Sequence, residues 1–278
     1  MKSVLLIGQS NMAGRGFLNE ATPIYNENIF MLRNGRWQMM AEPIHFDRSV
    51  SGVGPAASFA QAWCNANKNE QIGLIPCAEG GSSIDEWNKE GALFRHAVSE
   101  AKFAMENSEL IAILWHQGES DSHSGKIRKI IIQKTLMILV NSFRKELEAL
   151  EVPFIAGGLG DYLGKSGFGR SCVEYDLINQ ELLKYAEYNR NCYFVTGEKL
   201  YPNPDGIHIN AESQRILGIR YFKAYQTKSN VVEPLDNEAN MVKELCEREY
   251  TIAEKRYITL EQFTLGKSSM EEVLKFLK

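Results

Sequence analysis

The stretch SVLLIGQSN, residues 3–11, decides the interpretation of this chain. Five uncharged residues, 3–7, end at Gly8, and Ser10 follows between the amide residues Gln9 and Asn11. A short apolar run of this kind is typical of a strand that is buried on both faces of a sheet. The stretch therefore predicts a buried first strand, with a serine in the polar loop at its carboxyl end.

Four more apolar runs follow, and helical patterns separate them. The runs lie at 72–75, 110–114, 153–156 and 192–195, and the helical patterns at 56–67, 93–106, 126–150, 173–189 and 211–225. In the third of these patterns Leu136, Val140 and Phe143 recur at steps of four and three, as on one face of a helix. The alternation predicts an α/β fold, with a five-stranded parallel sheet between two layers of helices.

Loops that leave the carboxyl ends of parallel strands meet at one edge of the sheet, where ligands bind. Four polar segments are expected there: GQSN at 8–11, EGGS at 79–82, HQGE at 116–119 and DGIH at 205–208. They contain the parts of nucleophilic catalysis by a serine, with Ser10 as nucleophile, His208 as base and Asp205 as the acid that orients the base. The backbone N–H groups of Ser10 and Gly81 and the side-chain amide of Gln117 would form the oxyanion hole.

Each part also has an alternative interpretation. Ser10 could simply cap a turn after the strand. Glu119 is a second candidate for the acid, because its loop is expected beside the first. Four residues of types that bind metals lie close together in one predicted loop: His116, Glu119, Asp121 and His123. The sequence has no second cluster of such residues that would complete a metal site. We therefore expect no metal site and no cofactor.

The four segments, in this order, resemble the motifs of the SGNH hydrolase superfamily. They are most similar to its sialate O-acetylesterase-like and acetylxylan-esterase-like branch. The matching blocks are 8–14, 80–82, 115–121 and 205–208, and residues 52–60 (GVGPAASFA) also match. Gln117 stands where the superfamily has asparagine, as in this branch, and Ser82 replaces a threonine of many relatives. The resemblance covers residues 1–226.

The resemblance implies a flavodoxin-like fold and a cofactor-free serine esterase. Such an enzyme removes acetyl groups from the hydroxyls of a sugar or oligosaccharide through an acetyl-enzyme. The alternatives are a carbohydrate-binding protein without catalysis and an esterase directed at lipids or thioesters. We expect Gln9, Asn11, Arg15 and Trp87 to line the substrate pocket, with plain packing as the alternative for Trp87.

Composition limits the partners and the compartment. The 278 residues are 44% hydrophobic and carry a net charge of −4, so they have no basic excess for nucleic acid or an anionic membrane. Without an apolar segment long enough for a signal peptide or a membrane span, the expected location is the cytoplasm. The five widely spaced cysteines predict free thiols.

The expected domain organisation is an esterase domain, residues 1–228, followed by an extension, residues 229–278. Spaced apolar residues in the extension, among them Met241, Leu245, Leu260 and Phe263, predict short amphipathic helices. Such helices are marginal alone in water, so we expect them to pack on the esterase domain or on a second subunit of a homo-oligomer.

Overall fold

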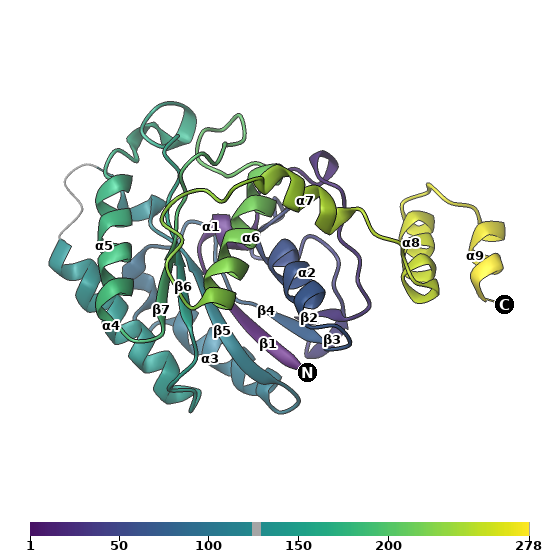
Figure 1. Ribbon diagram of the computed structural model, residues 1–278, viewed down its shortest axis with the longest axis horizontal. Coiled ribbons are helices and arrows are strands. Elements are labelled where there is room, and N and C mark those ends of the chain that lie inside the picture. Colours follow the sequence, from purple (N-terminus) through teal and green to yellow (C-terminus); the bar gives the residue numbers. More distant parts are fainter. Residues whose placement is uncertain (124–128, 278) are drawn as a thin grey trace.

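A computed structural model describes residues 1–123 and 129–277, and within them a seven-stranded sheet forms the centre of the fold (Figure 1). The strand order is β3-β2-β4-β1-β5-β6-β7. The strands are β1 (Lys2–Gly8), β2 (Ile29–Arg33), β3 (Arg36–Met39), β4 (Ile72–Pro76), β5 (Glu109–His116), β6 (Phe154–Gly157) and β7 (Cys192–Val195).

The α/β fold class is confirmed, and all five predicted strands are present. They form the parallel series β4-β1-β5-β6-β7, which in chain order is 2-1-3-4-5, the flavodoxin-like order. Val4, Leu5, Leu6 and Ile7 have no exposed surface, as expected for a strand covered on both faces. Because the strand order reverses at β1, the loop after β1 lies at the crevice where such sheets bind ligands.

The predicted number of strands was wrong, because the hairpin β2–β3 was missed. β2 pairs parallel with β4 and antiparallel with β3, which forms the edge of the sheet. Asn34 and Gly35 connect the two strands, with φ values of 51° and 68°. Positive φ at both positions is the requirement of a two-residue hairpin turn, for which Asn-Gly is the preferred sequence.

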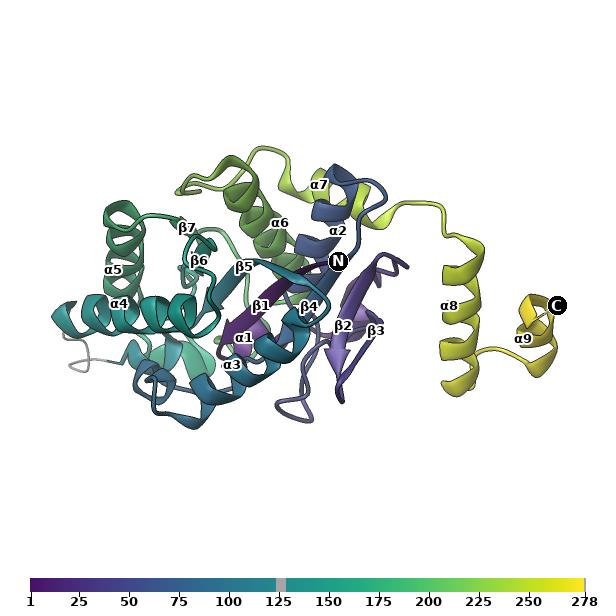
Figure 2. The same cartoon turned by 90° about the horizontal axis from the view of Figure 1, so that it is seen from below.

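The helices cover both faces of the sheet. They are α1 (Ser10–Ala13), α2 (Ala56–Ala66), α3 (Ala92–Met105), α4 (Lys129–Glu146), α5 (Tyr175–Tyr188), α6 (Ala211–Thr227), α7 (Glu238–Cys246), α8 (Ile252–Thr264) and α9 (Met270–Leu277). Helices α2 and α6 pack together on one face (Figure 2). On the other face Phe94 of α3 contacts Phe143 of α4, with ring centroids 4.4 Å apart, and α5 lies beside β7.

The five predicted helices lie within a few residues of the observed ones. Residues 126–128, the first of the predicted helix at 126–150, lie outside the described residues. The five cysteines are free thiols, as predicted. Across residues 1–123 and 129–277, no helix combines the length and apolar character needed to cross a bilayer.

The first part of the C-terminal extension packs on residues 1–228. Val231 continues the sheet beside β7, donating its N–H to Phe194 O and accepting from Thr196 N, both at 2.8 Å. Leu245 of α7 packs on Ala62 and Ile219. Residues 229–240 therefore add a parallel bridge beside β7 and then begin α7.

A buried ion pair joins α7 to α6. The Arg220 guanidinium has no exposed surface and donates Nε and Nη2 to the two carboxylate oxygens of Glu238, at 2.6 and 2.8 Å. Its third nitrogen, Nη1, donates to Thr196 O and Glu198 O, both at 2.8 Å. The charge of Arg220 is therefore compensated only while α7 is in place.

Helices α8 and α9 project from the body of the protein (Figures 1 and 2). The buried carboxylate of Glu254 in α8 accepts from the N–H of Glu27, at 2.9 Å, and the Tyr25 ring contacts Tyr250 and Tyr257. Large apolar side chains remain exposed in this region: Ile252, Leu260, Phe263, Leu265, Met270 and Leu274. That the extension joins two subunits stays a prediction.

We expect Glu238→Ala to lower the free energy of unfolding by about 3–5 kcal/mol, because it leaves the buried Arg220 charge without its partner. Urea denaturation measures this change. Glu244→Ala is the matched control, because Glu244 is exposed on the same helix, and it should alter stability by less than about 0.5 kcal/mol. Equal stability of the two variants would show that the pair does not hold α7.

Candidate active site

The candidate nucleophile lies where β1 ends. Gln9 donates its N–H to His116 O, at 2.8 Å, so the chain is still bonded to β5 one residue before Ser10. Ser10 then begins the single turn of α1, in which Met12 and Ala13 donate their N–H groups to Gln9 O. Ser10 is buried except for 6% of its surface. Its position at the carboxyl end of the central strand is the one that the sequence predicted.

Asp205 contacts the imidazole of His208 directly. The distance between Asp205 Oδ2 and His208 Nδ1 is 2.8 Å, and Asp205 Oδ1 accepts from the N–H groups of Ile207 and His208 at 3.0 and 2.9 Å. Burial favours the neutral acid, but these two N–H groups and the His208 ring hold the pKa of Asp205 below its usual value. The carboxylate therefore orients the ring through Nδ1, which leaves Nε2 as the nitrogen that can accept a proton.

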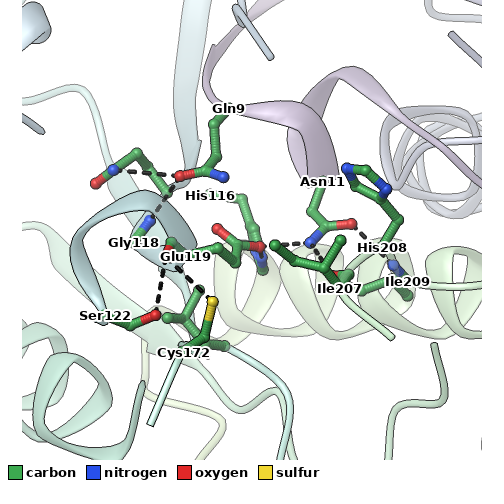
Figure 3. A network of polar contacts seen from close by, with 12 residues as sticks. Gln9, Asn11, His116, Gly118, Glu119, Ser122, Cys172, Ile207, His208 and Ile209 are labelled. Carbon is green, nitrogen blue, oxygen red and sulfur yellow. Dashed lines mark hydrogen bonds and ion pairs between the residues drawn. The ribbon is translucent and has the colours of Figure 1, made fainter. Parts of the chain in front are cut away.

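The side chain of Asn11 connects the serine segment to the histidine segment (Figure 3). Its Nδ2 donates to Ile207 O at 3.2 Å, and its Oδ1 accepts from Ile209 N at 2.9 Å. The residues on both sides of His208 are thus hydrogen-bonded to the residue that follows Ser10. This contact fixes the two segments relative to each other.

Glu119 contacts Asn11 rather than His208. Asn11 Nδ2 donates to Glu119 Oε1, and His116 Nε2 lies 3.3 Å from the same oxygen. All three side chains are buried. Burial favours the neutral acid, but His116 and Asn11 hold the pKa of Glu119 below its usual value. In Figure 3 Asn11 lies between Glu119 and His208, so Glu119 affects the imidazole through Asn11.

The loops that carry Gly81 and Gln117 are hydrogen-bonded to each other. Ser120 Oγ donates to Gly81 O at 3.1 Å, and Gln117 Nε2 donates to Ser82 O at 3.2 Å. Gly81 has a φ of +81°, and a Cβ atom added to it would meet no atom within 4 Å. The backbone at Gly81 therefore borders open space.

The amide nitrogen of Gln117 is already surrounded by acceptors. Besides Ser82 O, it lies 2.5 Å from Asp121 Oδ2 and 3.3 Å from Gln9 Oε1. An amide NH₂ group has two hydrogens, so both are used within the protein. Donation to a substrate would require Gln117 to exchange one of these contacts.

The four residues expected to line the substrate pocket are buried, and that expectation stays a prediction. Gln9, Asn11, Arg15 and Trp87 are between 0 and 6% exposed. Gln9 Oε1 accepts from the N–H groups of Gly118 and Ser120, and Arg15 forms an ion pair. Trp87 packs edge-on against Trp115 and donates its indole N–H to Ser82 Oγ at 3.0 Å, as its packing alternative predicted. Their hydrogen bonds and ion pairs connect the loops of the candidate site to one another.

The cluster considered as a metal site does not form one among residues 1–123 and 129–277. No group of three or more His, Cys, Asp or Glu side chains there is arranged to hold an ion. The carboxylate of Asp121 accepts from Ile84 N at 2.8 Å and from Gln117.

Two supporting residues were missed in the sequence. Asp47 is the ion-pair partner of Arg15 and lies 32 positions from it. Asn203 donates its side-chain amide to Arg15 O at 2.8 Å and its N–H to His208 O at 2.6 Å. Both lie in irregular segments without periodicity, although the prolines that flank Asn203 are a turn signal.

The chain is similar to known proteins in sequence and in fold. The family model described as "Carbohydrate esterase, sialic acid-specific acetylesterase" matches residues 1–227. The chain belongs to this family. The match confirms the resemblance of the four motifs, and it ends at the last residue of α6, so α7, α8 and α9 lie outside it.

Two relatives extend the comparison. A probable carbohydrate esterase from Arabidopsis thaliana is 30% identical over 247 residues, which are 80% of this chain and 88% of that protein. Its crystal structure superposes with a TM-score of 0.73 at 28% identity, covering 81% of this chain and 98% of that one. A carbohydrate acetylesterase from Xanthomonas citri has the same fold, with a TM-score of 0.58 at 16% identity, covering 81% of this chain and 56% of that one.

The lowered pKa of Glu119 predicts how stability changes with pH. A carboxylate with a lower pKa in the folded chain stabilises the fold above its unfolded pKa, about 4.3, and the contribution is lost as the pH falls through the folded value. The difference in unfolding free energy between wild type and Glu119→Gln should therefore be largest near pH 7 and shrink below about pH 4.

Urea denaturation between pH 3 and pH 7 tests this expectation. Glu187→Gln is the control, because Glu187 is exposed on α5, and its difference from wild type should stay near zero throughout. If the difference in unfolding free energy between wild type and Glu119→Gln does not change with pH, the folded protein does not hold Glu119 as a carboxylate.

Proposed function

We propose that the chain is a serine esterase that hydrolyses O-acetyl groups on a carbohydrate through an acetyl-enzyme. The observation that carries the proposal is the contact of Asp205 with His208, on a segment that Asn11 bonds to the serine loop. An acid, an imidazole and a serine on adjacent segments are the parts that ester hydrolysis requires. Membership of the carbohydrate esterase family and the name of the Arabidopsis relative support the substrate class.

The first half of the reaction transfers the acetyl group to the enzyme. Ser10 Oγ attacks the acetyl carbonyl carbon while His208 Nε2 takes the hydroxyl proton. The negative charge that forms on the carbonyl oxygen is stabilised by the backbone N–H groups of Ser10 and Gly81, each worth about 3 kcal/mol. Protonated His208 then gives its proton to the sugar oxygen, so the carbon–oxygen bond breaks and the sugar leaves as an alcohol.

The second half releases acetate. Water gives a proton to His208 Nε2 and attacks the acetyl carbon of the acetyl-enzyme, and the same donors stabilise the oxyanion. Return of the proton to Ser10 Oγ restores the serine. We propose Ser10 and Gly81 as the principal donors and Gln117 as a third donor that exchanges one of its protein contacts.

Replacing Ser10 tests the nucleophile. Ser10→Ala should lower kcat on 4-nitrophenyl acetate and on an acetylated sugar by at least about 10⁴-fold, because no acetyl-enzyme can form. A fluorophosphonate probe should label wild type and not the variant, and the melting temperature should stay nearly unchanged. Activity within tenfold of wild type would overturn the assignment, and absence of labelling in wild type would favour a binding protein. Faster hydrolysis of octanoyl than of acetyl esters would favour a lipid-directed enzyme.

Asp205→Asn and Glu119→Gln test which acid orients His208. Loss of Asp205 should lower kcat by roughly 10³- to 10⁴-fold, because the neutral amide no longer favours the productive tautomer. Glu119→Gln should be milder, within about 10²-fold, because it disturbs only the position of Asn11. The measurement is kcat of both variants on the same acetyl ester. A larger loss for Glu119→Gln would make Asp205 the supporting residue.

A further inference from the structure

A buried ion pair whose side chains have no direct part in the proposed reaction joins two loops. Arg15 Nη2 lies 2.5 Å from Asp47 Oδ2, and Arg15 Nη1 donates to Asp47 Oδ1 at 3.3 Å. The Arg15 and Asp47 side chains are only 5 and 3% exposed. Ser51 Oγ also donates to Asp47 Oδ1, at 2.8 Å. Arg15 follows α1, and Asp47 lies in the loop between β3 and α2, so the Arg15–Asp47 pair connects the serine segment to a distant part of the chain.

The same carboxylate reaches the loop of Gly81. Asp47 Oδ2 accepts from the N–H of Gly80 at 2.8 Å, and the neighbouring Arg48 donates to Gly80 O at 3.2 Å. In a trans peptide unit the C=O and N–H groups point in opposite directions. A contact that holds Gly80 O therefore also sets the direction of the N–H of Gly81, the proposed oxyanion donor.

The Gly80 backbone lies directly against the Arg15–Asp47 pair. A Cβ atom at Gly80 would come within 2.4 Å of Arg15 Nη2 and 2.8 Å of Asp47 Oδ2. A Cβ at Gly81 would meet nothing within 4 Å. The loop thus has one residue in contact with the pair and the next beside open space.

Arg15 also contacts the histidine segment through its backbone. Its carbonyl oxygen accepts from Asn203 Nδ2 at 2.8 Å, and Asn203 donates its N–H to His208 O at 2.6 Å. Nη1 of Arg15 further donates to Gly14 O at 2.8 Å. One residue therefore touches the serine segment, the loop of Gly80 and the histidine segment.

We propose that the Arg15–Asp47 pair positions the oxyanion hole, by holding the N–H of Gly80, one residue before the proposed donor Gly81, relative to Ser10. The pair acts through this backbone contact, beside the contact of Arg48 with Gly80 O, and does not contact substrate. This inference rests on the proposed function. The ionised form of Asp47 suits the role, because a carboxylate accepts from Arg15, Ser51 and Gly80 at once, whereas an asparagine has one oxygen and would turn an NH₂ group toward a donor.

The test compares Asp47→Asn with wild type on 4-nitrophenyl acetate and on an acetylated sugar. Because the oxyanion is common to all acetyl esters, kcat should fall by a similar factor on both, roughly 10- to 100-fold, with KM within about twofold. A boronic acid adds to the serine nucleophile and places an oxygen near the oxyanion donors, so it imitates the transition state. Its affinity for Asp47→Asn should therefore be lower than for wild type by a factor similar to the loss in kcat/KM. Rates are expressed per active site, counted by fluorophosphonate labelling.

Glu238→Gln is the matched control, because it removes the negative charge beside another buried arginine. That arginine, Arg220, donates to Thr196, Glu198 and Glu238. It should lower stability and leave kcat per labelled site unchanged. Gly80→Ala is the second variant, for the case that Asp47→Asn does not fold. Its methyl group displaces the loop from the pair and should reproduce the loss of kcat with little change in KM.

The outcomes separate the two proposals. Wild-type kcat per site in either Asp47→Asn or Gly80→Ala overturns the positioning role. A rise in KM for the sugar ester alone also overturns it, because that result would make the pair a substrate contact. If wild type hydrolyses neither ester, the proposed function fails and this inference fails with it. If wild type is active and Asp47→Asn has the same kcat, only this inference is rejected.

Discussion

The side-chain amide of Asn11 is the contact on which the candidate site depends. It bonds the residue after Ser10 to the backbone on both sides of His208, although the two segments are almost 200 residues apart in the sequence. Its third partner is the buried carboxylate of Glu119, which follows β5. Each of these groups would be costly to leave unpaired in the interior, at about 1–3 kcal/mol apiece. The fold therefore cannot separate the serine from the histidine without losing several buried hydrogen bonds.

The buried carboxylates of Glu119 and Asp47 bind side chains of the protein and so help to position the serine segment. Glu119 contacts Asn11, and Asp47 contacts Arg15, so both carboxylates hold side chains of the serine segment. Both carboxylates keep a lowered pKa because donors surround them, despite the burial that opposes ionisation. Ionic hydrogen bonds are short and directional. Two such contacts on one segment restrict its movement more than apolar packing would.

The sequence predicts the framework of this site better than its details. The five parallel strands could be recognised because residues buried on both faces form unbroken apolar runs, and the polar loops could be placed at one edge by topology alone. The hairpin β2–β3 was not predicted although Asn34-Gly35 is a strong turn signal, because neither strand is buried on both faces along its length, and β3 forms no unbroken apolar run. Motif position could not tell that Asn11 and Arg15 point inward. Their partners Glu119 and Asp47 are distant in the chain, and only the folded structure brings them together.

The partial exposure of His208 and Asp205 bears on the fate of the proposed acetyl-enzyme. The side chains of His208 and Asp205 are 24 and 27% exposed, whereas Ser10 and Asn11 are almost covered. In the proposed mechanism the base therefore faces solvent while the acetyl group is attached to Ser10. Water then reaches His208 without displacing any part of the protein, whereas another sugar alcohol would first have to bind. Such an arrangement favours release of acetate over transfer of the acetyl group to a second sugar.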